Sequence, residues 1–185
     1  SEVQFSQAVQ KADDTPNGGE GFHVGSLDYR QPNYEITKKV DILFVTDTSS
    51  SLDDERITIA NNIGSFVSAL PADADYTLAV LLAHGPSSSR YGHLYRPSTN
   101  TPYVLKSSDL APGANFSAQL KARLTNLPGD NASDGGEVGQ RAVRRLLDNN
   151  LAEARNQGFF RQDAALAVVF ISDENDICAI YPDDV

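Results

Sequence analysis

The stretch that decides the fold is VDILFVTDTSSSLDDE, residues 40–55. It begins with the apolar run 42–45, which is short for a helix and rich in β-branched residues, as expected of a strand buried on both faces. Hydroxyl and carboxylate side chains follow at once, and the acidic run 53–55 comes after them. A helix dipole favours acidic residues in the first turn. The stretch therefore predicts a buried strand, an oxygen-rich loop and the start of a helix.

Strands and helices alternate along the chain around this stretch. A helix is predicted over residues 53–69, because apolar residues recur there at helical spacing and Pro71 stops it. Further buried strands are predicted at 76–83 and 164–171, and further helices at 116–127 and 138–153. Alternating strands and helices predict an α/β fold, with a doubly wound, mostly parallel sheet flanked by helices, as in Rossmann-like folds.

Two other segments lie outside this alternation. Residues 1–35 are polar and irregular, and we interpret them as an N-terminal arm that precedes a main domain over 36–185. Residues 93–96 and 103–106 flank a segment with a proline at each end, which predicts a hairpin at a sheet edge. The tyrosines of this region either pack at that edge or form a binding surface.

Composition narrows the range of functions. The chain has 185 residues and a net charge of -10. This charge argues against a nucleic-acid partner, because phosphate backbones bind to basic faces, but it suits the binding of hard cations. No apolar run approaches the roughly 20 residues that a membrane-spanning helix needs, so no direct membrane insertion is expected. The lone Cys178 predicts neither an internal disulfide nor a zinc cage.

Three oxygen-rich loops follow or precede the predicted elements. The first strand ends in Asp47-x-Ser49-x-Ser51, the last buried strand ends in Ser172-Asp173-Glu174, and the loop before the 138–153 helix holds Asp134-Gly135-Gly136-Glu137. Ligands on parallel sheets bind beyond the carboxyl ends of the strands. Small divalent cations such as Mg²⁺ take about six oxygen ligands. We therefore expect these loops to converge on one divalent cation: Mg²⁺, Mn²⁺ or Ca²⁺.

The run VDILFVTDTSSSLDDE resembles the first strand and the DxSxS loop of von Willebrand factor A domains, where the motif forms the metal-ion-dependent adhesion site. The resemblance covers residues 40–176. In the family a Thr, or in some branches an acidic residue, stands five residues before an Ala-apolar pair, as Glu137 does here before Ala142. With an acidic residue at this position, the chain resembles integrin β chains and some bacterial envelope members of the family. The resemblance implies a metal shell of Asp47, Ser49, Ser51, Glu137 and Asp173, with Asp134 as the alternative to Glu137.

The same resemblance implies a binding module rather than an enzyme. An open coordination position would accept a carboxylate or another oxygen from a partner, which is a protein or another surface ligand. Many members of the family are extracellular, periplasmic or associated with the cell envelope, and we expect that location here. The family continues beyond the strand that precedes Asp173, so we expect its C-terminal part to be missing from this chain.

Other interpretations of these residues stay open. Asp47, Ser49 and Ser51 also suit a helix N-terminus, and Glu137 suits the first turn of a helix. An enzyme of the haloacid dehalogenase type would use a strand-terminal Asp with Mg²⁺ to transfer phosphate, but it needs a second Asp where Ser49 stands. A structural component of an envelope assembly would use the ion for stability alone. His84 and His93 lack a third ligand at suitable spacing and are interpreted as surface residues.

Overall fold

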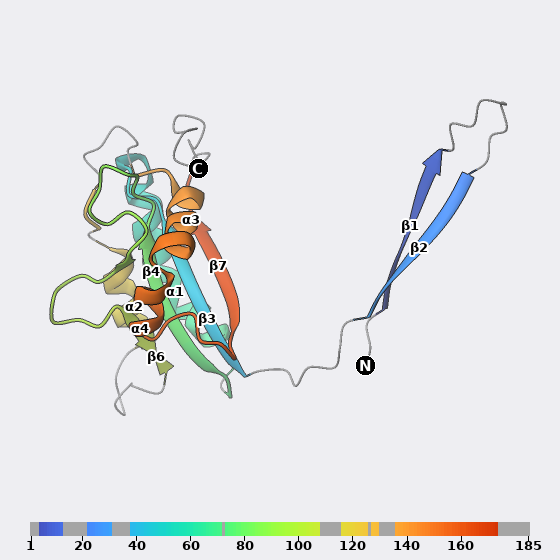
Figure 1. Cartoon of the computed structure of the whole chain (residues 1–185). Coiled ribbons are helices and arrows are strands. Elements are labelled where there is room, and N and C mark those ends of the chain that lie inside the picture. Colours follow the sequence, from blue (N-terminus) through green and yellow to red (C-terminus); the bar gives the residue numbers. More distant parts are fainter. Residues whose placement is uncertain are drawn as a thin grey trace. The chain divides into compact units, whose positions relative to one another are not determined.

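The computed structural model describes residues 4–12, 22–30, 38–71, 73–107, 116–125, 127–129 and 136–173. The chain divides into two compact units, Ser1–Ile36 and Thr37–Val185. In the first unit, β1 (Gln4–Ala12) pairs antiparallel with β2 (Phe22–Arg30) (Figure 1). The segment interpreted as an N-terminal arm therefore contains a regular two-stranded sheet, in which each strand supplies the backbone hydrogen-bond partners of the other.

The second unit holds a five-stranded mixed sheet. Its three long strands run parallel, with β3 in the middle, and two short strands run antiparallel along the far side of β4. This arrangement confirms the α/β class. The strands are β3 (Lys39–Thr46), β4 (Asp75–Leu82), β5 (Leu94–Tyr95), β6 (Val104–Lys106) and β7 (Ala165–Ile171).

The predicted hairpin over 93–106 is wrong. Both β5 and β6 pair with β4 instead of with each other. Tyr95 lies opposite Val80, and Val104 lies opposite Ala79, the residue that precedes Val80 in β4. Together they form one antiparallel edge strand, interrupted by residues 96–103. The prolines at 97 and 102 lack the N–H group that a ladder needs, which is consistent with this segment leaving the sheet.

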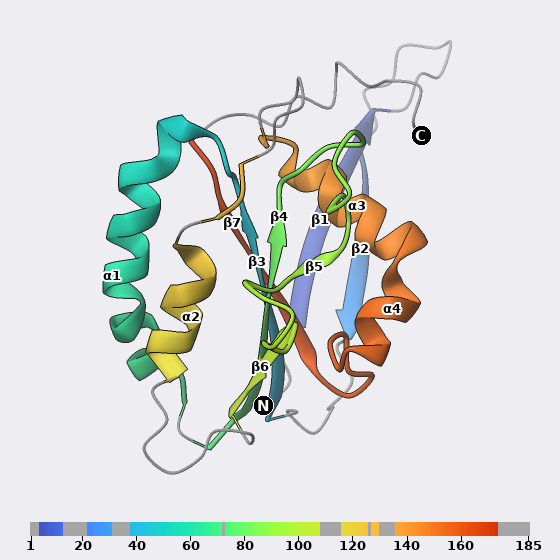
Figure 2. The same ribbon diagram turned by 90° about the vertical axis from the view of Figure 1, so that its left-hand side faces the viewer.

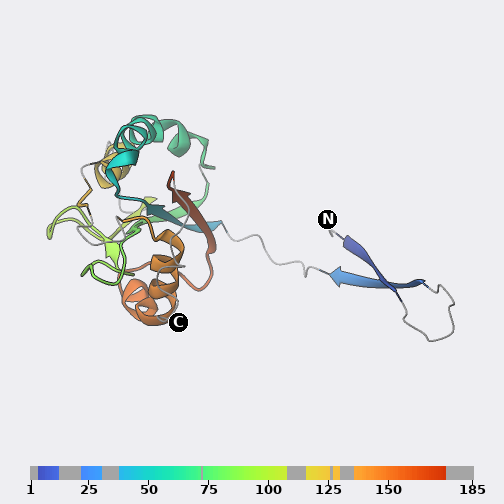
Figure 3. The ribbon, with the colours of Figure 1, turned by 90° about the horizontal axis from the view of Figure 1, so that it is seen from above.

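Helices cover both faces of the sheet. Figure 2 shows α1 (Asp53–Ala69) and α2 (Phe116–Leu124) on one side, and α3 (Gly139–Asn149) and α4 (Leu151–Asn156) on the other, and Figure 3 shows the same layers from above. A 3₁₀ turn, η1 (Ser50–Leu52), leads into α1. None of the described helices is long and apolar enough to cross a membrane.

The sequence predicts one helix over 138–153, but the structure breaks it in two. The break is at Asn150, whose backbone leaves the helical region with φ -118° and ψ 10°. Its side-chain Nδ2 donates to the Gly92 carbonyl oxygen at 2.8 Å. This bond ties the junction of α3 and α4 to the segment that leads into β5. A contact of this kind is set by tertiary structure, so helical periodicity does not predict it.

The core lies in two layers, one on each face of the sheet. Ile42 and Phe44 of β3 face the layer beneath α1 and α2, whereas Leu43 and Val45 face the layer beneath α3 and α4. Successive side chains of a strand point to opposite faces, so a strand covered on both sides needs an uninterrupted apolar run. The prediction that β3 and β4 are buried on both faces is confirmed.

The same prediction is wrong for β7. This strand pairs only with β3 among the described strands, and it lies at the edge of the sheet. Leu166 and Phe170 are 49% and 50% exposed, and Val168 between them is exposed as well. The alternate residues Ala167 and Val169 pack against the layer beneath α1. An apolar run shows that two apolar faces exist, but it does not show that both are covered within the described residues.

Candidate metal site

Backbone hydrogen bonds bring the predicted loops together at the carboxyl end of the sheet. One bond ties the end of β3 to the end of β7, and another ties it to the segment that opens α3. Two further bonds involve the end of β4. The donors and acceptors are Asp47 N to Ile171 O (2.9 Å), Thr48 N to Gly136 O (3.2 Å), Ala83 N to Thr46 O (2.8 Å) and Val138 N to Ala83 O (3.0 Å). The convergence expected from the carboxyl-end rule is therefore present in the backbone.

Asp47 lies at the centre of this convergence. It is only 1% exposed. Its Oδ1 accepts a hydrogen bond from the Ser49 backbone N–H at 2.7 Å, and its Oδ2 accepts one from the Ser172 hydroxyl at 3.0 Å. Both donors are neutral. Burying a carboxylate is costly unless a charge or strong hydrogen bonds compensate it. Two neutral hydrogen-bond donors thus position the carboxylate, and no cationic side chain of the described residues donates to it.

Ser49 and Ser51 present their hydroxyl groups together. The two Oγ atoms lie 2.9 Å apart and share a hydrogen bond, in which either hydroxyl can be the donor. Neighbouring ligands of an octahedral ion with bonds of 2.0–2.1 Å are also separated by about 2.9 Å. Ser51 is exposed and Ser49 is half-buried, so the pair faces outward from the loop. This spacing suits two cis ligands of one small cation.

Arg56, which lies near the start of α1, holds the loop by its backbone. Its Nη1 donates to the carbonyl oxygens of Asp47 (3.1 Å) and Ser49 (2.8 Å), and its Nη2 pairs with the Asp53 carboxylate. Arg56 is buried. Sequence patterns do not predict this role, because an arginine in the first turns of a helix is usually solvent-exposed.

The two remaining predicted ligands lie next to these loops. Asp173 follows Ser172 and is exposed, and Glu137 follows Gly136 and is half-buried. Among the described contacts, neither carboxylate is hydrogen-bonded to Asp47. Ser172, which the sequence did not single out, makes that contact instead. Asp134 lies outside the described residues.

Other oxygen and nitrogen ligands are sparse in the described region. The Thr48 Oγ1 is buried and has no hydrogen-bond partner among the described residues, which adds one more oxygen to this loop. No three His, Cys, Asp or Glu side chains gather around a common point in the part of the chain that the structure describes. A site here therefore depends on serine hydroxyls beside the carboxylates.

The two histidines near β4 differ in environment. His84 is fully buried, which corrects the prediction that it is a surface residue. Its Nδ1 lies 2.8 Å from the Ser88 hydroxyl and its Nε2 lies 3.2 Å from the Pro128 carbonyl oxygen. His93 is partly exposed, with its Nδ1 3.0 Å from a Glu153 carboxylate oxygen. His84 thus joins two loops as a structural residue.

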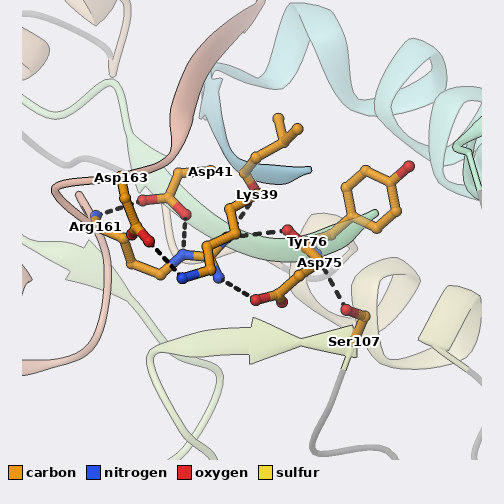
Figure 4. Close-up of polar contacts among 8 residues, drawn as sticks. Lys39, Asp41, Asp75, Tyr76, Ser107, Arg161 and Asp163 are labelled. Carbon is orange, nitrogen blue, oxygen red and sulfur yellow. Dashed lines mark hydrogen bonds and ion pairs between the residues drawn. The ribbon is translucent and has the colours of Figure 1, made fainter. Parts of the chain in front are cut away.

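The opposite end of the sheet carries a different polar cluster (Figure 4). Arg161 donates from its backbone N and its Nε to the two Asp41 oxygens, at 2.7 Å each, and from Nη1 to Asp75, also at 2.7 Å. Lys39 pairs with Asp163 beside them. Burial acts to lower the pKa of Arg161, but the hydrogen bonds and charges of Asp41 and Asp75 raise it above its ordinary value. Every charge in this cluster has a partner, which is typical of a structural network.

Comparison of the chain with protein-family models, curated proteins and solved structures returned no match.

Proposed function

We propose that this chain is a divalent-cation-dependent binding module of the von Willebrand factor A type. Asp47, Ser49 and Ser51 would bind one ion at the carboxyl end of the sheet. Asp173 and either Glu137 or Asp134 would complete the shell. The observation that carries the proposal is the buried Asp47 carboxylate. Among the described residues its hydrogen-bond donors are all neutral, and two hydroxyl oxygens 2.9 Å apart lie in the same loop. The mixed sheet with helices on both faces is consistent with that fold family.

The residues in and around this loop would have different roles in such a site. The Ser49 N–H and the Ser172 hydroxyl fix the orientation of the Asp47 carboxylate, and Arg56 fixes the backbone of the loop through two carbonyl oxygens. Fixed outer contacts of this kind strengthen a metal site because they hold its ligands in place before the ion arrives. When bound, the ion would supply an open position for a carboxylate or other oxygen from a partner, and no residue of the chain would act as a nucleophile.

The alternatives fit the chain less well. A phosphate-transferring enzyme of the haloacid dehalogenase type would use Asp47 as an attacking group, but it needs a second aspartate at the position where this chain has Ser49. A structural component would use the ion for stability alone. This case differs from a binding module in one respect: a structural ion would take every ligand from the chain itself and would not accept an external carboxylate.

The test is a calorimetric titration of Mg²⁺, Mn²⁺ and Ca²⁺ into chelator-stripped protein. We expect saturable one-to-one binding in the unmodified chain and no binding in Asp47→Ala. Ser51→Ala should weaken binding by about tenfold or more, because it removes one ligand. Ser50→Ala is the matched control: its exposed serine lies between the two proposed ligands in the same loop. It should bind like the unmodified chain.

Two outcomes contradict the proposal. Absence of binding in a folded, unmodified sample would leave Asp47 and the serines as a loop that caps a helix. Equal losses in Ser50→Ala and Ser51→Ala would show that the loop responds to any substitution and that no particular hydroxyl binds the ion. If the ion binds, a titration of acetate into the loaded protein separates a binding module, which accepts the carboxylate, from a structural site, which does not.

A further inference from the structure

A cavity of about 290 Å³ is lined by residues of β5, by the segments that flank this strand and by Glu153 of α4. Figure 2 shows where β5 and α4 lie in the fold. The cavity lining includes residues just before β5, the two residues of β5 itself, both ends of the segment 96–103 between β5 and β6, and one side chain of α4. The side chains that matter for its chemistry are Arg90, His93, Tyr95, Arg96, Tyr103 and Glu153.

The charge of this cavity is opposite to that of the whole chain. The sequence holds 25 acidic residues against 15 Lys and Arg residues. The cavity reverses this balance, with Arg90, Arg96 and the titratable His93 against the single carboxylate of Glu153. Both oxygens of that carboxylate are in use: Oε2 lies 3.0 Å from His93 Nδ1, and Oε1 accepts a hydrogen bond from Gln157 at 3.0 Å. The two arginines are therefore not neutralised by it.

Arg96 is held in place by neutral partners. Its guanidinium carbon lies 4.4 Å from the centre of the Tyr103 ring, and its Nη1 donates to the Thr99 carbonyl oxygen at 3.1 Å. A guanidinium has five N–H donors in one plane. Stacking and one hydrogen bond restrict its position but leave its charge and most of its donors available. This arrangement lowers the entropy that Arg96 would lose when it binds an anion.

A third guanidinium does not line the cavity but contacts the segment between β5 and β6. Arg123 of α2 is 2% exposed, and it donates to the carbonyl oxygens of Pro102 (2.7 Å) and Gln119 (3.3 Å). Its Nε has no hydrogen-bond partner among the described residues. Burial raises the pKa of Tyr95, a residue that lines the cavity, although the charges of Arg90 and Arg123 act to lower it. Among the described residues, no carboxylate lies within 4.0 Å of Arg90, Arg96 or Arg123. An anion bound in the cavity would give Arg90 and Arg96 the acidic partner that they lack among the described residues.

We propose that this cavity binds a small organic oxyanion, with Arg90 and Arg96 holding its carboxylate or phosphate group and Tyr95 and Tyr103 contacting its body. Planar arginine forks match the geometry of both anions. The volume lies at the lower end of the range of about 300–1,000 Å³ for ligand pockets, so the ligand is a single ring or smaller. This site is independent of the proposed metal site, and either could exist without the other.

The experiment is a backbone amide NMR titration of the whole chain in the presence of a chelator, so that no divalent ion contributes. Glucuronate supplies a carboxylate on a ring, glucose is its uncharged counterpart, and inorganic phosphate supplies the other anion. Sodium chloride at matched ionic strength controls for screening. We expect glucuronate, phosphate or both to shift the amides of residues 90–96 and 103 saturably. Glucose and chloride should not shift them. The tighter of the two anions identifies the group that the natural ligand carries.

Matched variants test the role of the arginines. Arg96→Gln should weaken anion binding by about tenfold or more, because a charge-assisted hydrogen bond is lost. Arg155→Gln removes the same charge from an exposed position on α4 and should leave binding unchanged. Arg96→Lys keeps the charge without the planar fork and should give an intermediate affinity, which separates recognition from misfolding. Absence of saturable shifts with both anions would overturn the proposal, as would equal losses in Arg96→Gln and Arg155→Gln.

Discussion

A buried aspartate lies near each end of strand β3, Asp41 inside the strand and Asp47 directly after it, and the two differ in what surrounds them. Asp41 and Asp47 are each 1% exposed. Asp41, at the amino end, accepts two hydrogen bonds from Arg161, which also pairs with Asp75 (Figure 4). Asp47, at the carboxyl end, accepts one bond from a backbone N–H and one from a serine hydroxyl.

The difference separates a structural carboxylate from a candidate ligand. Arg161 donates to both oxygens of the Asp41 carboxylate and compensates its charge, so Asp41 already has the cationic partner that a metal ion would otherwise supply. The donors to Asp47 orient it but carry no net charge. A carboxylate that is positioned without being neutralised can still attract a cation. The contrast can be tested, because the two aspartates should respond in opposite ways to substitution and to added ions.

The largest expected effect is on stability in the presence of a chelator. Asp41→Asn removes the carboxylate that pairs with Arg161 and should lower the free energy of unfolding by about 3 kcal/mol. This value is in the lower part of the range for breaking a buried ion pair, because Arg161 is partly exposed and still pairs with Asp75. Asp47→Asn keeps an acceptor for the Ser49 N–H and should cost less than about 1 kcal/mol. Urea unfolding of both variants measures this. A loss at Asp47 as large as that at Asp41 would erase the contrast.

Local patterns predicted much of the fold. The helix predicted over 53–69 has those bounds in the structure, because its acidic first turn and Pro71 mark both ends in the sequence. The three long strands lie within one residue of their predicted bounds at most ends, because uninterrupted apolar runs are a local signal. The edge position of β7 and the interrupted strand formed by β5 and β6 were missed. Both depend on which segments become neighbours, and periodicity carries no information on that.

The same division holds for the candidate site. The carboxyl-end rule predicted that the loops after β3 and β7 and before α3 would meet, and their backbones do. The contacts of Arg56 with the loop carbonyls and of Ser172 with Asp47 were not predicted. Serine and arginine are common on surfaces, and nothing in their spacing marks these two as partners of a buried aspartate. The sequence thus predicted which loops meet at the site, but it did not predict which side chains of those loops contact Asp47 and its backbone.

The second prediction concerns the gain in stability on adding ions. At a Mg²⁺ concentration about 100 times its dissociation constant, binding to the folded state alone raises the free energy of unfolding by about 2.7 kcal/mol. We expect this gain in the unmodified chain and in Asp41→Asn, because the amino end takes no part in the site. Asp47→Asn should show no gain. Urea unfolding with Mg²⁺ and with chelator gives all three values, and a gain in Asp47→Asn would place the ion elsewhere.

A smaller effect is expected at Ser172, which orients Asp47 without being one of the proposed ligands. Ser172→Ala removes the donor to Oδ2 and should weaken ion binding by about tenfold, in line with the loss of an outer contact in other metal sites. Ser172→Thr keeps a hydroxyl at this position and should restore most of the affinity. Calorimetric titration of the two variants measures this. Equal affinities in both would mean that the hydrogen bond to Oδ2 does not prepare the carboxylate for the ion.

The smallest effect belongs to the exposed pair at the amino end, Lys39 and Asp163. The hydrogen bond from Lys39 lowers the pKa of Asp163 below its ordinary value. A carboxyl whose pKa is depressed in the folded state stabilises the fold above its unfolded pKa, about 3.9, and this contribution is lost as pH falls through the folded value. Lys39→Met should therefore move the pKa of Asp163 back toward the ordinary carboxyl value, as measured by carbon NMR of the side chain.

The stability difference between the unmodified chain and Lys39→Met should follow the same window. It should stay constant from neutral pH down to about pH 5 and shrink below about pH 4, as Asp163 becomes protonated in both proteins. Because the pair is exposed, salt should reduce the difference at neutral pH as well. A difference that ignores both pH and salt would assign the effect of Lys39 to the packing of its aliphatic stem, and the amino end would then owe its charge-dependent stability to Arg161 and its two aspartates.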